Sequence, residues 1–201
     1  RFMSRVTSIE ELSNLKSKIE TERKFTKQVL ICGGTGCISS GSNEIADKMT
    51  EKVKAAGKEN EIRVIKTGCF GFCEKGPIVK MLPDNTFYTE VTPEDADRLV
   101  ETHLLKEEKI EELLYVDPVT KNKISDSDHM DFYKKQERVA LRNCGVIDPE
   151  NIEDYLLYDG YTALDKVLKM SQQEVVDIMK DSGLRGRGGG GFPTGLKWQF
   201  A

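Results

Sequence analysis

The chain has 201 residues, of which 38% are hydrophobic and 32% are charged, and its formal net charge is −4. This length allows one large or two small domains, and the negative charge argues against nucleic acid as the main partner. No apolar run approaches the roughly 18 residues of a transmembrane helix, and residues 1–25 are too charged for a signal peptide. Five cysteines without export features are typical of a reducing cytoplasm, where we expect the protein to be.

The first half of the sequence predicts alternating helices and strands. A capping box that begins at Thr7, followed by apolar residues at helical spacing, predicts a helix over residues 8–24. An apolar strand over 28–32 is followed by a glycine-rich loop and by a helix that ends near Gly57. Residues 61–66 alternate between apolar and polar side chains, as a strand does.

Two more strands and a helix are predicted next. Residues 77–82 and 86–91 flank Pro-Asp-Asn, a turn sequence, and therefore predict a β-hairpin. Thr92 and Pro93 start a helix, because threonine caps a helix and proline fits its first position. The inward-facing residues of this helix are Ala96, Leu99, Val100 and Leu104. The order β-α-β-β-β-α predicts a small α/β sandwich with a parallel crossover and an antiparallel hairpin.

Four cysteines lie in two short loops, each of which follows an apolar run. Cys32 and Cys37 form a C-x4-C pair, and Cys69 and Cys73 form a C-x3-C pair, with 31 residues between the two pairs. Glycines in and around both loops let the backbone bend and bring N–H groups close to sulfur, where they stabilise negative charge. These glycines are Gly33, Gly34, Gly36, Gly68, Gly71 and Gly76.

Three kinds of site compete for these cysteines. A structural zinc site usually has C-x2-C knuckles, so the spacing matches it poorly. Two disulfides are conceivable, but nothing else in the sequence indicates export. A [2Fe-2S] cluster with four thiolate ligands fits best, although the spacing differs from the plant-type pattern in which three ligands share one loop.

The two cysteine segments also resemble a known family. VLICGGTGC at residues 29–37 and KTGCFGFC at residues 66–73 are similar to the thioredoxin-like [2Fe-2S] ferredoxin module, over about residues 26–105. That module occurs as a small subunit of complex I-type NADH dehydrogenases and fused to flavoprotein subunits of NAD-linked hydrogenases. The resemblance implies a thioredoxin-like fold and a cluster held by Cys32, Cys37, Cys69 and Cys73.

A charged, turn-rich stretch separates this module from the rest of the chain. Residues 106–135 predict a linker, with the domain boundary near residues 110–130. We therefore expect a first domain over 1–112, a charged linker over 113–135 and a second domain over 136–201.

Three further residues could be ligands, and we assign none of them to a site. His103 and His129 lie in polar sequence surroundings, which gives no indication of a metal or of histidine-based catalysis. Cys144 has no neighbouring cysteine or histidine, which favours a buried structural thiol.

A glycine-rich segment near the C-terminus is the second chemical motif. Residues 183–198 carry three basic residues and no acid, and exposed backbone N–H groups with fixed positive charge suit a phosphate-bearing ligand. The segment contains a G-x-G-x-x-G pattern, but this pattern follows a predicted helix, whereas in a Rossmann fold it follows a strand. The segment does not match the P-loop pattern either. A flexible glycine hinge is the alternative, although interleaved arginine, aromatic and lysine residues are not typical of linkers.

This segment, RGRGGGGFPTGLKW at residues 185–198, resembles the FMN- and NADH-binding loop of the complex I flavoprotein subunit and its hydrogenase relatives. The resemblance implies that the glycines let the backbone approach the flavin, that Phe192 stacks on the nicotinamide nucleotide and that Lys197 contacts the cofactor. The residues assigned to the cofactor in this way are Gly186, Arg187, Gly188, Gly189, Gly190, Gly191, Phe192, Gly195 and Lys197.

Together the two resemblances imply the N-terminal part of an iron–sulfur flavoprotein, namely the diaphorase subunit of an NAD(P)-linked, often electron-bifurcating, [FeFe]-hydrogenase. The sequence stops within a predicted helix start, so we expect a longer protein whose [4Fe-4S] clusters and remaining FMN and NAD(P)H contacts lie beyond Ala201. The expected partners are a small [2Fe-2S] subunit, the catalytic hydrogenase subunit and NAD(H). No catalytic residue, membrane span or nucleic-acid partner is expected in this segment.

Two alternatives stay open. One is the diaphorase subunit of an NAD-dependent formate dehydrogenase, which would use the same cofactors. The other is a ferredoxin-like or zinc-stabilised docking module whose glycine loop contacts a partner and which catalyses nothing.

Overall fold

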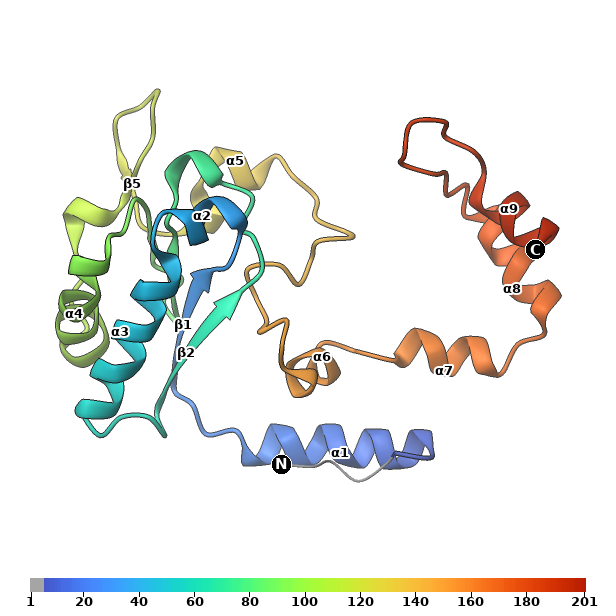
Figure 1. Ribbon diagram of the computed structural model, residues 1–201, viewed down its shortest axis with the longest axis horizontal. Helices are drawn as coiled ribbons and strands as arrows, with labels where there is room; N and C mark the ends of the chain where they lie inside the picture. The colour runs from blue at the N-terminus through green and yellow to red at the C-terminus, as the bar shows by residue number, and fades with distance from the viewer. Residues whose placement is uncertain (1–5) are drawn as a thin grey trace. The chain divides into compact units, whose positions relative to one another are not determined.

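The structure is a computed structural model that describes residues 6–201 (Figure 1). Leu15–Tyr158 form one compact unit, and Asp159–Ala201 belong to a second unit together with residues 6–14. The helix predicted over 8–24 is observed as α1 (Ile9–Glu22), and Ile19 is its buried residue. In the described part of the chain, no helix has both the length and the apolar character needed to cross a bilayer.

A mixed four-stranded sheet is the centre of the larger unit. Strand β1 (Lys27–Cys32) pairs in parallel with β2 (Ile62–Thr67) and antiparallel with β3 (Val79–Leu82), which pairs with β4 (Phe87–Tyr88). The order β2-β1-β3-β4 confirms the predicted parallel crossover and the predicted hairpin. The crossover is made by α3 (Ser42–Ala55), which runs alongside β1 and β2 in Figure 1.

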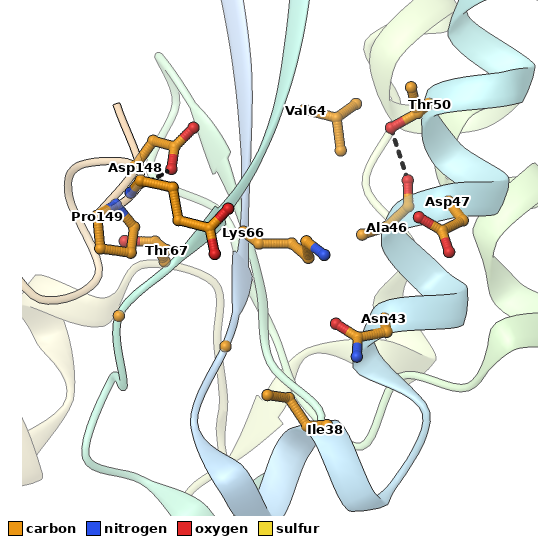
Figure 2. Close-up of a pocket in the computed structure, with 13 residues that line it drawn as sticks. Ile38, Asn43, Ala46, Asp47, Thr50, Val64, Lys66, Thr67, Asp148 and Pro149 are labelled. Atoms are coloured by element: carbon orange, nitrogen blue, oxygen red, sulfur yellow. Dashed lines mark hydrogen bonds between the residues drawn. The ribbon is translucent and has the colours of Figure 1, made fainter. Parts of the chain in front are cut away.

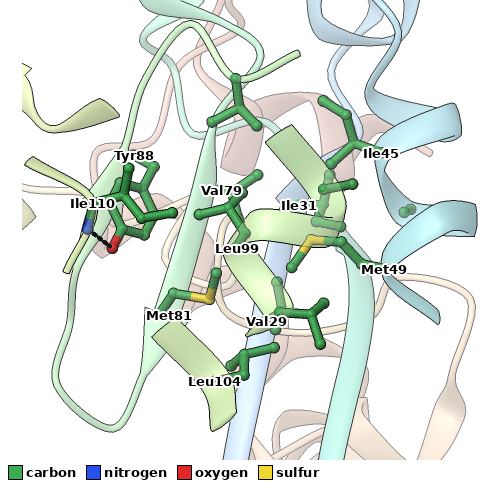
Figure 3. Close-up of a cluster of buried hydrophobic side chains, with 14 of the residues drawn as sticks. Val29, Ile31, Ile45, Met49, Val79, Met81, Tyr88, Leu99, Leu104 and Ile110 are labelled. Atoms are coloured by element: carbon green, nitrogen blue, oxygen red, sulfur yellow. Dashed lines mark hydrogen bonds between the residues drawn. The ribbon is translucent and has the colours of Figure 1, made fainter. Parts of the chain in front are cut away.

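Alternate side chains of β1 point to opposite faces of the sheet and enter two separate cores. Val29 and Ile31 pack against Ile45 and Met49 of α3 (Figure 3). The same core takes in the segment that begins at Thr92, as predicted, although only Ala96–Arg98 (α4) is α-helical there. A 3-10 turn at Pro93–Asp95 comes before it and a wider π-type turn at Leu99–Leu104 comes after it.

The second face of the sheet is covered by residues for which we predicted a linker. The core on that face contains Leu30, Ile65, Phe87, Tyr115 and Met130. The segment 113–135 is folded there into β5 (Tyr115–Val116), β6 (Lys123–Ile124) and α5 (Asp131–Lys134). Because β1 is buried on both faces, its second face has to be covered, and a few apolar residues inside the charged stretch provide the cover. The division of the chain into functional domains stays a prediction.

The loop between β1 and α3 also differs from the prediction. We expected a glycine-rich loop, and the structure has a short helix, α2 (Thr35–Ser39), which contains Cys37. The carbonyl of Gly34 accepts from the amide of Ile38, so a helical turn forms in spite of the glycines.

Helix α6 (Ile152–Leu157) is held to the sheet by a buried carboxylate. Asp154 is 3% exposed and accepts from Arg63 of β2 at 2.9 Å. Arg23 Nη2 lies 2.5 Å from the same carboxylate oxygen of Asp154, and the other oxygen accepts from the amide of Asp148. This single side chain therefore joins β2, the end of α1 and the segment that leads into α6.

The smaller unit contains three short helices, α7 (Thr162–Leu168), α8 (Gln172–Asp181) and α9 (Thr194–Phe200). A capping box starts α8, with Ser171 and Glu174 bonded to each other's backbone amides. Helices α8 and α9 approach closely at Gly195, where an added Cβ would lie 2.5 Å from the backbone nitrogen of Lys180.

We predict that Asp154→Asn lowers the free energy of unfolding at pH 7 by about 2 kcal/mol, because Arg63 loses its buried partner. Burial by itself raises the pKa of Asp154, but the Asp148 amide, Arg63 and Arg23 hold that pKa below its ordinary value of 3.8. The carboxylate therefore stabilises the fold fully above pH 3.8 and loses this effect as pH falls through the lower, folded-state pKa.

Urea unfolding of wild type and variant, followed by circular dichroism from pH 7 down past pH 3.8, should show the difference shrinking in acid. Glu153→Gln is the matched control, since that side chain is 42% exposed and touches Arg23 only at 3.6 Å. A difference in unfolding free energy that does not change with pH would contradict the stabilising role of the Asp154 carboxylate.

We also predict that Gly195→Ala opens the contact between α8 and α9, because the new methyl group would meet backbone atoms that cannot move aside. Amide hydrogen exchange in both helices should accelerate by roughly tenfold. Gly190→Ala is the control, since no atom lies within 4 Å of the added Cβ. Equal exchange in the two variants would show that the close approach is unimportant.

Candidate metal centre

The two cysteine loops meet because β1 and β2 are parallel. Cys32 is the last residue of β1 and is paired in register with Thr67, the last residue of β2, and Cys69 follows two residues later. The carboxyl ends of parallel strands lie at the same edge of a sheet, so both loops leave that edge together. Cys37 lies in α2, and Cys73 begins a single 3-10 turn.

The thiols are arranged as two pairs. Cys69 Sγ and Cys73 Sγ lie 4.0 Å apart, close to the roughly 3.8 Å that separates two thiolates bound to one tetrahedral ion. Cys32 and Cys37 are near neighbours, since Cys32 contributes to the raised pKa of Cys37. A Cβ on Gly34 would come within 3.0 Å of Cys69 Sγ and 3.5 Å of Cys32 Sγ, so one glycine lies against a sulfur from each pair.

Within residues 6–201, no group of three or more His, Cys, Asp and Glu side chains is gathered tightly enough to hold a single metal ion. The donor set consists instead of two adjacent pairs of thiols, as a centre with two metal ions requires, each ion taking two protein ligands.

Two of the four thiols, those of Cys37 and Cys73, have raised pKa values. Burial, followed by the neighbouring Cys32, raises the pKa of Cys37 to about 12. Cys73 also has a raised pKa, caused first by its hydrogen bond with Cys69 and then by the charge of that residue. A bound cation reverses both effects, because it neutralises the thiolates and favours their deprotonated form. The chemistry of the site therefore fits a cationic metal centre.

One backbone donor is already directed at sulfur. The amide of Gly71 donates to Cys69 Sγ at 3.2 Å. Gly71 has φ of +82°, a left-handed conformation that only glycine adopts without strain. Donors of this kind stabilise the negative charge of a metal-bound thiolate.

Aromatic rings surround the second loop. Phe70 is buried and packs edge-on against Phe87, while Phe72 is half-buried and stacks on Phe132 with 4.7 Å between ring centroids. Tyr133 and Arg138, to which the sequence analysis gave no role, both donate to the carbonyl of Phe70. These contacts join residues more than 60 positions apart, so no local spacing in the sequence could have indicated them.

His103 is buried, although the sequence around it is polar. The side chain is 8% exposed, and its Nδ1 lies 2.7 Å from the hydroxyl of buried Tyr88. Burial lowers the pKa of His103, although Asp84 on its other side raises it.

His129 is exposed and faces Asp126 at 3.3 Å. Cys144 is half-buried, rather than buried as predicted, and lies against Gly68.

A cavity of about 330 Å³ lies between α3 and β2 (Figure 2). Lys66 extends across it toward Asn43 and Asp47 of α3, and acidic residues of the segment at 148–150 line the opposite side. Gly33 and Gly68 reach it from the two loops, but no cysteine lines it. The cavity is therefore separate from the thiols.

The glycine-rich segment forms a closed loop in the smaller unit. Its base is held by two backbone hydrogen bonds, Gly186 N–H to Phe192 O and Thr194 N–H to Leu184 O, each 2.9 Å long. The residues predicted to contact the cofactor lie on this loop and on α9. Those that are exposed are Gly186, Arg187, Gly188, Gly189, Gly190, Phe192 and Lys197.

Two of the residues predicted to contact the cofactor, Gly191 and Gly195, are not among the exposed ones. Gly195 is buried against α8, which gives it a packing role in the structure, and Gly191 turns the chain at φ of +59°. Among residues 6–201, no ion pair involves Arg187 or Lys197, so both cations are available to an anion.

Comparison with known proteins finds relatives that are parts of larger enzymes. The chain is 65% identical over 68 residues to the NADP-reducing hydrogenase subunit HndC of Solidesulfovibrio fructosivorans, over 34% of this chain and 14% of that protein. It is 57% identical over 51 residues to one of the NADH-quinone oxidoreductase subunits of Aquifex aeolicus, over 25% of this chain and 12% of the relative. The chain thus matches only about an eighth of the length of these relatives.

Two further comparisons concern [2Fe-2S] ferredoxins. A 2Fe-2S ferredoxin from Clostridium pasteurianum is 36% identical over 77 residues, which make up 38% of this chain and 76% of the ferredoxin. The family model described as thioredoxin-like [2Fe-2S] ferredoxin matches residues 4–104, half of the chain. With its mixed sheet and its two cysteine loops at one edge, the chain belongs to the thioredoxin-like [2Fe-2S] ferredoxin family.

Proposed function

We propose that Cys32, Cys37, Cys69 and Cys73 hold a [2Fe-2S] cluster and that the chain transfers single electrons through it. The observation that carries this proposal is the meeting of two thiol pairs around Gly34 at one edge of the sheet. Membership of a [2Fe-2S] family supports the cluster over a zinc ion.

The cluster supplies reversible one-electron chemistry, and the protein supplies its ligands and surroundings. Buried Cys32 and Cys37 hold the inner side, while exposed Cys73 lies on the side that a redox partner can approach. The amide of Gly71 stabilises the charge on Cys69, and Phe70 and Phe72 limit the access of water to that loop.

In the complete protein, this module is part of a flavoprotein-type subunit of an NAD(P)-linked hydrogenase or an NADH-quinone oxidoreductase. The hydrogenase and oxidoreductase relatives support this assignment. The exposed glycine loop with Arg187, Phe192 and Lys197 suits a phosphate-bearing cofactor, which in this proposal is FMN with NAD(P)H. The proposal also includes electron bifurcation with an [FeFe]-hydrogenase subunit. It places [4Fe-4S] clusters beyond Ala201 and the protein in the cytoplasm.

The cluster is tested first by anaerobic iron and sulfide analysis of the 201-residue chain, with EPR after dithionite reduction. About two irons and two sulfides per chain and a signal from the reduced state are expected. Serine in place of any one of Cys32, Cys37, Cys69 or Cys73 should abolish or change the signal, because a hydroxyl is a poor replacement for a thiolate ligand.

Cys144→Ser is the matched control and should keep the wild-type iron content and spectrum. One zinc without sulfide would refute the electron-transfer function. A wild-type EPR signal in all four ligand variants, or loss of the signal in Cys144→Ser, would refute the assignment of the ligands.

A further inference from the structure

Two side chains from outside the ferredoxin module hold one peptide group of the second cysteine loop. Arg138 Nη2 donates to the carbonyl oxygen of Phe70 at 2.8 Å, and the hydroxyl of Tyr133 donates to the same oxygen at 3.0 Å. Both residues lie beyond residues 4–104, the range matched by the ferredoxin family.

The other end of that peptide group faces a cysteine. The Phe70 carbonyl and the Gly71 N–H belong to one planar peptide unit and point in opposite directions. Because Arg138 and Tyr133 fix the oxygen, they also fix the N–H, which donates to Cys69 Sγ at 3.2 Å. A charged donor on the carbonyl polarises the peptide and strengthens its N–H as a donor.

Close packing leaves this arrangement little freedom. A Cβ on Gly71 would lie 2.9 Å from Arg138 Nη2, and a Cβ on Gly145 would lie 2.7 Å from the ring of Phe70. Arg138 also donates to the carbonyl of Cys144 at 3.3 Å and lies over the ring of Tyr133 at 5.8 Å. The guanidinium is therefore held in one position against the loop.

The charge of Arg138 is not neutralised by a carboxylate. The side chain is half-buried, and no Asp or Glu within residues 6–201 forms an ion pair with it. A partly buried cation without an anionic partner is unfavourable. A cluster with four thiolate ligands is an anion, and it would lie behind the peptide group that Arg138 holds.

We propose that Arg138 is a positioning residue for the iron–sulfur cluster, which orients the Phe70–Gly71 peptide toward Cys69 and raises the reduction potential of the cluster. The inference rests on the proposed function, since it requires that Cys69 is a ligand. Reduction adds one negative charge, so a fixed cation and a stronger N–H donor both favour the reduced state.

The test is an EPR-monitored redox titration of the 201-residue chain and its variants. Arg138→Gln should move the midpoint potential to more negative values, and Arg138→Lys, which keeps the charge but loses the forked geometry, should move it less. Tyr133→Phe removes one neutral donor and should give a small shift in the same direction. Arg142→Gln removes the same charge from an exposed position four residues away and should leave the potential unchanged.

A purely structural role would lower the unfolding midpoint of Arg138→Gln without moving its potential, and this result would overturn the proposal. Equal shifts in Arg138→Gln and Arg142→Gln would also overturn it, because the effect would then depend on net charge alone. If Arg138→Gln cannot hold a cluster, shifts in Arg138→Lys and Tyr133→Phe support the proposal and wild-type potentials in both refute it. A wild-type chain without any cluster would refute the proposed function itself.

Discussion

The parallel pairing of β1 with β2 is the constraint on which the candidate metal centre depends. Its register places Cys32 beside Thr67, so the loops that carry the two cysteine pairs leave the same edge of the sheet. A shift by one residue would turn Cys32 and Leu30 out of the second core and onto the opposite face of the sheet. The apolar side chains that fix the register therefore also fix the position of the thiols.

Burial of both faces of β1 connects the metal centre to the later part of the chain. The second face carries Cys32 and is covered by residues 115–133, whose last member, Tyr133, also donates to the loop of Cys69. The chain continues from these residues to Arg138, which donates to the Phe70 carbonyl, and further on to Asp154, which accepts from Arg63 of β2. Segments outside the ferredoxin module thus hold the cysteine loops from the side that faces away from α3.

The glycines of the C-terminal segment have two kinds of surroundings. Gly195 is needed where α9 meets α8, because no side chain fits against the backbone of Lys180. Gly188 and Gly190 have open space around them, so packing gives no reason for glycine at those positions. The exposed glycines, together with Arg187 and Lys197, which form no ion pair within residues 6–201, are therefore the part of the motif that is available to a ligand.

The sequence by itself determined the order of the main helices and strands up to Leu104 and the α/β class, and it singled out the four cysteines as candidate ligands, because periodicity, caps and ligand spacing are local patterns. It did not determine that α2 forms within the glycine loop or that residues 113–135 cover the sheet, because the high charge of the stretch hid a few apolar residues. It also missed the burial of His103 against Tyr88 and the hold of Arg138 on the Phe70–Gly71 peptide. These contacts join residues far apart in the chain, and only the folded sheet, with both faces in need of cover, brings them together.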